Sequence, residues 1–415
     1  MAFSKGERRV VGQASLAHAL THLYMVAFPA MVMPLVRETG ASVAEVLQGA
    51  FLGFLLFGLG GLPAGWLTDR FSARAVLIAN MFGCGAAACL CAVAPDLAAL
   101  ALLHGLLGLF ASLYHPAGMA LLTRTVRKRG KALAVNGMVG NLGLAAAPLL
   151  VGLIATTLGW RTAWLVLGAP SIFVGAWILL APIEESVAEA PQDTVLSSRP
   201  ASLFAVLCVA MCLAGLAFQG TTITMPAFFE MRVSFLDEIV APLERFAPGG
   251  SGTVAATALA STAYLFAVGG QALGGYLADH WDLRKGFIAL HLAAAPFAAA
   301  SYWCAEWAVP LAIFGYTFFQ LGMQPVENSL VAELSPERLR GSAYGLKFVL
   351  SFGVGALAVP AVGGIETAWG LSTVYLFVAA ASGANAAIAV TLALLSNRYD
   401  RDAKSVRPAR RPRQA

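Results

Sequence analysis

Long apolar stretches constrain the fold of this chain more than any other feature. One of them, "LAALALLHGLLGLFASLYHPAGMALLT" at residues 97–123, contains no Asp, Glu, Lys or Arg. An apolar run of about 18 residues or more predicts a helix that spans a membrane. The 415 residues are 59% hydrophobic and 12% charged, whereas an average soluble domain is about 45–50% apolar and about 25% charged. We therefore interpret the chain as an all-α, polytopic membrane protein.

Twelve such stretches can be delimited. The predicted spans are 12–36, 44–67, 74–94, 97–123, 131–156, 160–182, 201–226, 254–279, 284–305, 307–333, 341–365 and 370–396. A polar stretch with two prolines separates the first six from the last six, and this composition is typical of a linker. We predict an N-terminal six-helix bundle over 1–182, a linker over 183–200, a second bundle over 201–396 and a basic tail over 397–415.

The distribution of basic residues predicts the orientation. Of the 27 Lys and Arg residues, 22 fall on the side of the two termini and the linker. Only Arg37, Arg161, Arg232 and Arg245 fall on the other side, and Lys347 lies within a span. Because cytoplasmic loops carry the excess of Lys and Arg, we expect both termini to be cytoplasmic. The basic residues occupy short loops and a tail, so we expect a lipid bilayer as partner and no nucleic acid.

The two halves of the chain resemble each other. "GWLTDRFSAR" (65–74) follows the second span, and "GYLADHWDLRK" (275–285) follows the eighth. "YHPAGMALLT" (114–123) aligns with "MQPVENSLVA" (323–332) at nearly the same separation. Transporters are often built from two related halves, so this repeat favours a transporter.

A G-x-L-x-D-R motif after the second span, with a copy after the eighth in an arrangement of six plus six spans, resembles the major facilitator superfamily. The resemblance covers essentially the whole chain. It implies two pseudo-symmetric six-helix bundles that rock around a central site, which opens alternately to each side. The first copy departs from the common pattern at Thr68 and Ser72, and the second has His280 in place of the arginine.

The resemblance also implies a gate on the cytoplasmic side. An aspartate there can stabilise the N-terminus of a helix in the other bundle, by about 0.3–1 kcal/mol at an exposed position. Charges that merely set the topology are the alternative interpretation. The candidate gating residues are Asp69, Arg70, Arg74, Asp279 and Arg284.

A second resemblance narrows the family. "SLAHALTHLY" in the first span, "YHPAG" in the fourth and "VGNLGLAAAPLLVGLI" in the fifth are similar to the fosmidomycin-resistance-type exporters. The fifth span also resembles the superfamily's antiporter motif, which implies antiport, although Ala147 stands where the motif has a glycine. Close packing of small residues between helices explains this pattern equally well.

Ionisable residues within the spans are functional candidates, because burying one costs about 2.5–3.5 kcal/mol on insertion scales. His115 stands beside Pro116 and either handles protons or substrate, or bonds a carbonyl that the proline leaves free. His18 and His22 share one helix face. They form a polar stripe in a cavity, a structural pair or a metal site; because no HExxH motif accompanies them, we predict no metal.

Glu327 and Lys347 lie at similar depths on two antiparallel spans, so we expect them to pair. The pair is either structural, or Glu327 takes a proton when Lys347 leaves it and so couples transport to the proton gradient. Four amide side chains complete the predicted substrate site: Asn141, Gln219, Gln324 and Asn328.

These features predict a secondary active transporter. The sequence has no GxxxxGK[ST] motif for ATP and no nucleophile elbow, so we expect neither an ATP-driven pump nor an enzyme, and no cofactor. Proton-driven efflux of a small organic compound is the leading hypothesis. A proton-coupled importer and a transporter-like sensor are the alternatives. We expect a monomer in the inner membrane of a bacterium.

Overall fold

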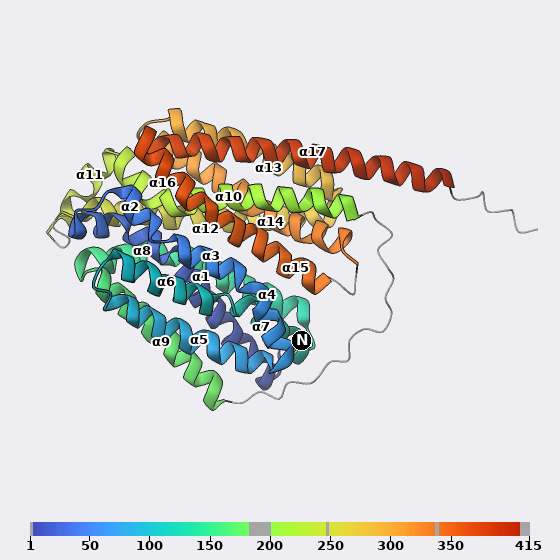
Figure 1. The fold of residues 1–415 in the computed structure, drawn as a ribbon, viewed down its shortest axis with the longest axis horizontal. Helices are drawn as coiled ribbons and strands as arrows, with labels where there is room; N and C mark the ends of the chain where they lie inside the picture. Colours follow the sequence, from blue (N-terminus) through green and yellow to red (C-terminus); the bar gives the residue numbers. More distant parts are fainter. Residues whose placement is uncertain (1–2, 182–200, 246–248, 337–339, 407–415) are drawn as a thin grey trace, which may run out of the picture.

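The computed structural model describes residues 3–181, 201–245, 249–336 and 340–406. All regular secondary structure in these ranges is helical, as predicted. Most of the predicted linker 183–200 and the end of the predicted tail lie outside the described residues. Figure 1 shows α1–α9 lying together in one half of the molecule and α10–α17 in the other.

In the first half, the second span is divided into α2, α3 and α4, and the fourth is divided into α6 and α7. The helices of this half are α1 (Lys5–Thr39), α2 (Val43–Gln48), α3 (Phe51–Leu59), α4 (Gly61–Arg70), α5 (Ala73–Ala92), α6 (Leu97–Ala111), α7 (Tyr114–Thr125), α8 (Arg129–Thr157) and α9 (Trp160–Leu180). In the second half, a π-helical segment, η3, interrupts one span. Its elements are α10 (Ala201–Arg232), α11 (Phe235–Val240), η1 (Ala241–Leu243), α12 (Ser251–His280), α13 (Leu283–Trp303), α14 (Ala308–Leu334), α15 (Arg340–Phe348), η3 (Val349–Val354), η4 (Gly355–Leu357), α16 (Ala358–Trp369), η5 (Leu371–Thr373) and α17 (Val374–Val406).

Each of the twelve predicted spans corresponds to helical structure. Within the described residues, ten spans are long and apolar enough to cross a membrane, and the bent series α2–α4 makes an eleventh. The remaining segment is α14, whose 27 residues include Gln320, Gln324, Glu327 and Asn328. These polar side chains lower its apolarity, and polar groups within a span make it a candidate functional helix. α17 continues past the predicted end of the last span at 396, so the predicted tail begins as helix.

Serine caps fix where two helices begin. The Ser4 hydroxyl accepts from the backbone N–H of Glu7, whose carboxylate accepts from the Ser4 N–H at 2.9 Å. Ser42 and Glu45 form the same reciprocal pair ahead of α2. Such capping boxes satisfy backbone donors that the first turn leaves free. The backbone hydrogen bond from Ser4 lowers the pKa of Glu7.

A break between α6 and α7 places the candidate His115. Proline lacks an N–H and fits best in the first turn of a helix, where that N–H would have no partner within the helix. Pro116 lies in the first turn of α7, which begins at Tyr114, and residues 112 and 113 form the break. His115 therefore stands at the start of a helix near the middle of the predicted span 97–123.

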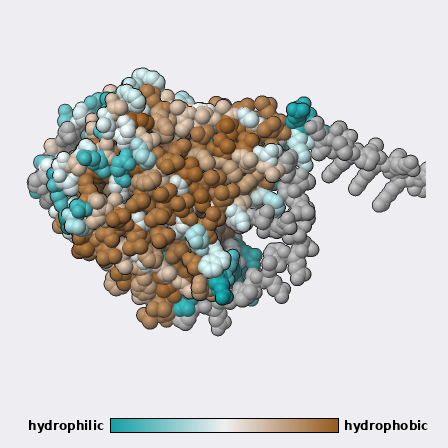
Figure 2. All heavy atoms as spheres, viewed as in Figure 1, coloured by the Kyte–Doolittle hydropathy of each residue, from teal (hydrophilic) through white to brown (hydrophobic). Residues whose placement is uncertain are grey.

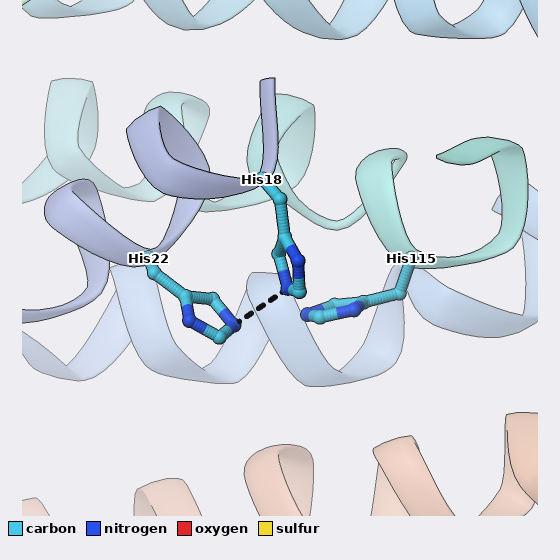
Figure 3. A group of neighbouring side chains, drawn as sticks. All are labelled: His18, His22 and His115. Atoms are coloured by element: carbon cyan, nitrogen blue, oxygen red, sulfur yellow. Dashed lines mark hydrogen bonds between the residues drawn. The ribbon is translucent and has the colours of Figure 1, made fainter. Parts of the chain in front are cut away.

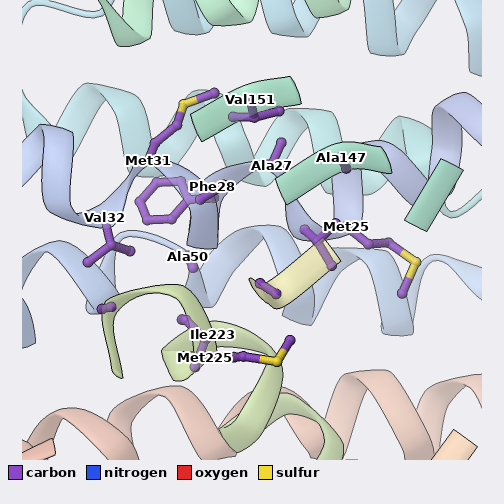
Figure 4. Packing of buried hydrophobic residues seen from close by; sticks show 14 of the residues in the cluster. Met25, Ala27, Phe28, Met31, Val32, Ala50, Ala147, Val151, Ile223 and Met225 are labelled. Atoms are coloured by element: carbon purple, nitrogen blue, oxygen red, sulfur yellow. The ribbon is translucent and has the colours of Figure 1, made fainter. Parts of the chain in front are cut away.

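The buried apolar residues form one core at one end of the molecule and two at the other. We call the end that carries Lys5, Asp69 and Asp400 the terminal face, and the other end the opposite face. Toward the opposite face, a single cluster joins both halves, and Figure 4 shows Phe28 and Ala50 of the first half between Met31 and Ile223. Toward the terminal face, each half has a cluster of its own. Among the described residues, the two bundles thus share a core only in the half toward the opposite face.

The exterior is apolar between these ends. Figure 2 shows a surface covered mainly by hydrophobic side chains, with polar ones gathered at the two ends. Leu102, Phe173 and Leu180 are 65%, 74% and 80% exposed. An exposed apolar belt of this extent suits contact with lipid rather than with water.

Candidate functional site

Three histidines lie close together at the depth where the core shared by both bundles ends and the two separate cores begin. His18 and His22 lie on α1, and His115 reaches them from α7, as Figure 3 shows. The Nε2 atoms of His18 and His22 are 3.1 Å apart. One ligand-type nitrogen from each ring lies within 4.8 Å of the others. The structure confirms that His18 and His22 share a face, and it adds His115 to them.

Neighbouring polar groups hold the rings in place. His18 Nδ1 lies 2.9 Å from the Asn136 carbonyl oxygen, and His22 Nδ1 lies 3.1 Å from the Gly140 carbonyl oxygen, both on α8. The Tyr114 hydroxyl donates to Asn136 Oδ1 at 2.7 Å, and its ring stacks on His18 with centroids 4.6 Å apart. Glycine is required at position 140, because a methyl group there would lie 2.5 Å from the His18 ring.

The predicted pair of Glu327 and Lys347 is present. Lys347 Nζ lies 2.7 Å from Glu327 Oε1 and donates to Asn328 Oδ1 at 2.6 Å. The side chains of Glu327 and Lys347 are 3% and 12% exposed. Two buried opposite charges in direct contact offset part of each other's desolvation cost. The contact is confirmed, whereas its role in proton coupling stays a prediction.

α15 connects the lysine to the histidines. Lys347 faces Glu327 on α14, while the next residue, Phe348, stacks on His115 of α7 with ring centroids 4.7 Å apart. Adjacent residues on a helix point about 100° apart, so one helix contacts both groups. The π-helical segment η3 follows directly. Segments of this kind occur frequently at functional sites.

A second polar link crosses between the bundles. The Asn141 amide on α8 donates to Gln271 Oε1 on α12, and Gln271 Nε2 donates to Gln324 Oε1 on α14 at 3.3 Å. The predicted Asn141 and Gln324 are therefore joined by a residue that was not predicted. Gln219 is fully buried, and neither of its side-chain polar atoms has a hydrogen-bond partner among the described residues.

The candidate gating residues lie at the terminal face. Asp69 pairs with Arg124 at 2.8 Å, and Arg74 donates to the carbonyl oxygens of residues 178 and 179 at the end of α9. Arg284 contacts Asp282 and Asp400, each at 3.0 Å. These contacts join elements of the same bundle. Arg70 and Asp279 are exposed. α4 itself packs beside α15 of the other bundle, and the gating role of these residues stays a prediction.

Comparison with known proteins identifies the family. The sequence matches the Major Facilitator Superfamily over residues 15–346 and 248–415. The chain belongs to this superfamily. It is therefore a multi-pass membrane transporter rather than an enzyme, which confirms the resemblance drawn from the G-x-L-x-D-R motif and its second copy.

Individual relatives match only part of the chain. The identity is 28% with a multidrug resistance protein B homolog of Mycobacterium tuberculosis, over 39% of this chain and 30% of that protein. It is 36% with a puromycin resistance protein of Streptomyces alboniger, over 27% and 22%. It is 26% with a niacin transporter of Acinetobacter baylyi, over 37% and 35%. The matched stretches thus span about a third or less of these relatives' lengths.

Solved structures match over nearly the whole length. A bacterial homolog of the human lysosomal transporter Spinster, inward-facing and occupied, superposes with a TM-score of 0.75 at 15% identity, over 94% of this chain and 98% of that one. A nucleoside transporter gives 0.72 at 14% identity, over 92% and 99%. At these identities the likeness establishes the fold.

Two residues that contact the candidate site in the structure, Gln271 and Phe348, were not predicted from sequence. Gln271 is a polar residue within an apolar span, and that signal was available in "AVGGQALGG". Phe348 gave no signal, because an aromatic residue in a membrane span is ordinarily interpreted as lipid-facing or as core. Its importance arises only from its stacking on His115.

Proposed function

We propose that this transporter exports a small organic compound in exchange for protons, by alternating access of a site between its two bundles. In this proposal the protein lies in a bacterial cytoplasmic membrane with both termini inside, so that the terminal face is cytoplasmic. The single observation that carries it is the buried pair of Glu327 and Lys347.

This pair has the properties that a coupling site requires. Glu327 is 2% exposed, and its Oε2 has no hydrogen-bond partner among the described residues. A carboxylate held by one cation in an apolar setting keeps its charge only while that cation stays. When α15 moves and withdraws Lys347, Glu327 takes up a proton; when Lys347 returns, the proton leaves.

The same helix links this exchange to the cargo. A movement of α15 that separates Lys347 from Glu327 also moves Phe348 off His115, which belongs to the proposed substrate site. Proton uptake and rearrangement of the cargo site then occur in one step. Coupling between two sites requires that both favour or disfavour the same movement, and here α15 contacts both the Glu327–Lys347 pair and His115.

Export is favoured over import by the kind of relatives that match. Two of those described above are named for resistance to drugs, and another is described as a resistance and export protein of Streptomyces glaucescens, 26% identical over 52% of this chain. Another relative is named a niacin transporter, and fold alone does not determine cargo. Proton symport is therefore the alternative that the experiment must separate from antiport.

The test is proton movement in proteoliposomes that contain a trapped pH dye. A panel of compounds that includes phosphonates is added outside, and internal pH is followed. Compound-dependent proton exit supports antiport, whereas proton entry with the compound contradicts it and indicates symport. Glu327→Gln is expected to abolish the compound-dependent pH change. Glu366→Gln, the same change on a half-exposed carboxylate of α16, should leave it intact.

If Glu327→Gln still moves protons with the compound, Glu327 is not the coupling group. If no compound on the panel causes proton movement with the parent protein, none of these compounds is exchanged for protons, and the proposal fails for this panel.

A further inference from the structure

The hydrogen bonds of the three histidines define where their lone pairs point. A backbone carbonyl oxygen only accepts hydrogen bonds. His22 Nδ1 faces the Gly140 carbonyl at 3.1 Å, so Nδ1 carries the hydrogen and Nε2 of the neutral ring carries the lone pair. His18 Nδ1 faces the Asn136 carbonyl at 2.9 Å and receives the same assignment. The Asn136 amide nitrogen, at 3.1 Å, is the longer contact of His18 Nδ1.

With these tautomers, two lone pairs face each other. The Nε2 atoms of His18 and His22 are 3.1 Å apart, and neither carries a hydrogen that would make this contact a hydrogen bond. Two acceptors at this distance repel unless a cation lies between them. A shared proton would satisfy these two nitrogens.

The third histidine distinguishes a proton from a metal. His115 Nε2 is buried and has no hydrogen-bond partner in the described part of the chain. Its ring points toward the other two in Figure 3, and one ligand-type nitrogen of each ring lies within 4.8 Å of the others. A proton between His18 and His22 leaves His115 unsatisfied, whereas one metal ion satisfies all three.

We propose that His18, His22 and His115 form a binding site for one divalent transition-metal ion of the zinc type. Imidazole suits Zn²⁺, Ni²⁺ and Cu²⁺, whereas Mg²⁺ and Ca²⁺ require oxygen ligands. Zn–N bonds of about 2.0 Å at tetrahedral angles place two ligand nitrogens about 3.3 Å apart. The 3.1 Å between His18 and His22 already fits, and His115 supplies the third nitrogen by turning its ring inward.

The surroundings of the site are those of a metal centre. Ligating histidines almost always donate their second N–H to a carbonyl or carboxylate, which fixes the ring and its tautomer. Asn136 and Gly140 supply such carbonyls from α8 to His18 and His22. Three neutral imidazoles leave the fourth position to water or to an anionic group of a ligand, as in open zinc sites.

This proposal departs from the prediction from sequence that no metal binds here. The sequence did not show a third ligand for His18 and His22, because His115 lies on a different span and its distance from them could not be predicted. The proposal does not rest on proton coupling or on the direction of transport. It concerns the binding of an ion to residues that are brought together in this conformation.

The experiment measures metal binding by purified protein that carries no polyhistidine tag. Equilibrium dialysis gives the amount of Zn²⁺ bound per chain, and Co²⁺ as a probe reports its geometry through visible absorption. We expect one Zn²⁺ per chain, with His22→Gln and His115→Gln each weakening binding by at least about ten-fold. His280→Gln on the exposed end of α12 and His291→Gln at a buried position of α13 are the matched controls and should bind as the parent does.

Size-exclusion chromatography identifies variants that remain folded, and only those are compared. The proposal is overturned if the parent protein binds no Zn²⁺, or if folded His22→Gln and His115→Gln proteins bind it as tightly as the parent. Glu327→Gln separates this proposal from the proposed function, because it should retain Zn²⁺ while losing proton coupling.

Discussion

At the scale of single residues, Glu327 and Lys347 show how a costly arrangement becomes useful. Each charge alone would be expensive in so buried a position, and each is tolerated because the other lies 2.7 Å away. Breaking a buried ion pair by removing one partner typically costs about 3–5 kcal/mol, since the remaining charge is left uncompensated. Replacing both partners by neutral groups avoids that penalty.

This asymmetry gives a prediction. Lys347→Met should lower the free energy of unfolding by about 3–5 kcal/mol, unless Glu327 binds a proton and relieves it. The double variant Glu327→Gln with Lys347→Met should recover most of that loss. Thermal unfolding in detergent, followed by tryptophan fluorescence, measures both.

The control is the exposed pair of Arg161 and Glu38, whose side chains are 46% and 49% exposed. Removing Arg161 should cost no more than about 1 kcal/mol. A loss in Lys347→Met that the double variant does not recover would not come from an uncompensated charge on Glu327, and the coupling mechanism would lose its physical basis.

The pairing of Glu327 with Lys347 could be predicted from sequence, because depth along antiparallel spans follows from counting residues. The link from Asn141 through Gln271 to Gln324 could not be predicted in this way. It depends on which faces of α8, α12 and α14 meet, and hydropathy does not encode rotation about a helix axis when all faces are apolar.

At the scale of elements, close contact between bundles depends on missing side chains. A methyl group on Gly58 of α3 would lie 2.0 Å from the backbone nitrogen of Gly353 in η3. Small residues let helix backbones approach in this way within a membrane. Gly65 of α4, seven residues further along, has nothing within 4 Å of such a methyl group.

Gly58→Ala should therefore destabilise this arrangement of the bundles by about 1–3 kcal/mol, the usual range for overpacking. Gly65→Ala should be neutral, or stabilising by up to about 1 kcal/mol, because alanine favours the helix. Melting temperatures of the two variants against the parent provide the comparison. Equal effects would show that α3 and η3 do not touch in solution.

The helix breaks mark the limit of prediction at this scale. Residues 44–67 were predicted as one span, but the structure divides the segment into α2, α3 and α4, with α3 and α4 meeting at 42° around Gly60. Glycine indicates that a break is permitted but does not require one. The break before α7 had a stronger signal in Pro116, since proline removes a backbone hydrogen bond, although Pro29 and Pro148 lie inside continuous helices.

The loop helix α11 gives a prediction about pH. Glu306 accepts hydrogen bonds from the Ser234 hydroxyl at 2.6 Å and from the Phe235 N–H at 3.2 Å, and these bonds lower its pKa from 4.5. A carboxyl group with a lowered pKa in the folded state stabilises the fold above its unfolded pKa. That contribution is lost as pH falls through the lowered value.

Hydrogen exchange at Ser234 and Phe235 tests this, with Glu306→Gln compared to the parent at each pH so that intrinsic rates cancel. At pH 6 the variant should exchange faster at these two amides. At pH 3 the difference should shrink as Glu306 of the parent becomes protonated. A difference that is the same at both pH values would show that the charge of Glu306 does not hold α11.

At the scale of the whole molecule, the positions of the shared and separate apolar cores indicate which face of the transporter is closed. The bundles share one apolar cluster toward the opposite face and have separate ones toward the terminal face. The histidines and the pair of Glu327 and Lys347 lie where the shared core ends. With the terminal face cytoplasmic, as proposed, this arrangement corresponds to a transporter closed to the outside.

The sequence repeat predicted two related halves, and the family match confirms the architecture. Which face the shared core closes was beyond prediction from sequence. Both conformations of an alternating-access transporter bury similar residues, and they differ by a few kcal/mol that depend on contacts between the halves.

A network at the opposite face supplies such contacts. Arg37 of α1 lies 2.5 Å from Glu230 of α10, and Thr253 of α12 bonds to both. Arg37 and Glu230 are 38% and 12% exposed, so water screens this contact between bundles only partly. Neutralising Arg37 should favour opening of the opposite face by about 1 kcal/mol, which corresponds to about a five-fold change in the ratio of the two conformations.

Arg37→Gln tests this with spin labels at Ala98, in the first turn of α6, and Ala305, just after the end of α13. Both are exposed positions at the opposite face, and they belong to different bundles. Electron–electron distance measurements should show an added population at longer distance in the variant. Arg161→Gln breaks an ion pair to Glu38 within one bundle at the same face, so it should leave the distribution unchanged. Since the two changes remove the same charge, a shift in both would assign the effect to surface charge. A shift in neither would mean that the shared apolar core alone, rather than the Arg37 network, keeps this face closed.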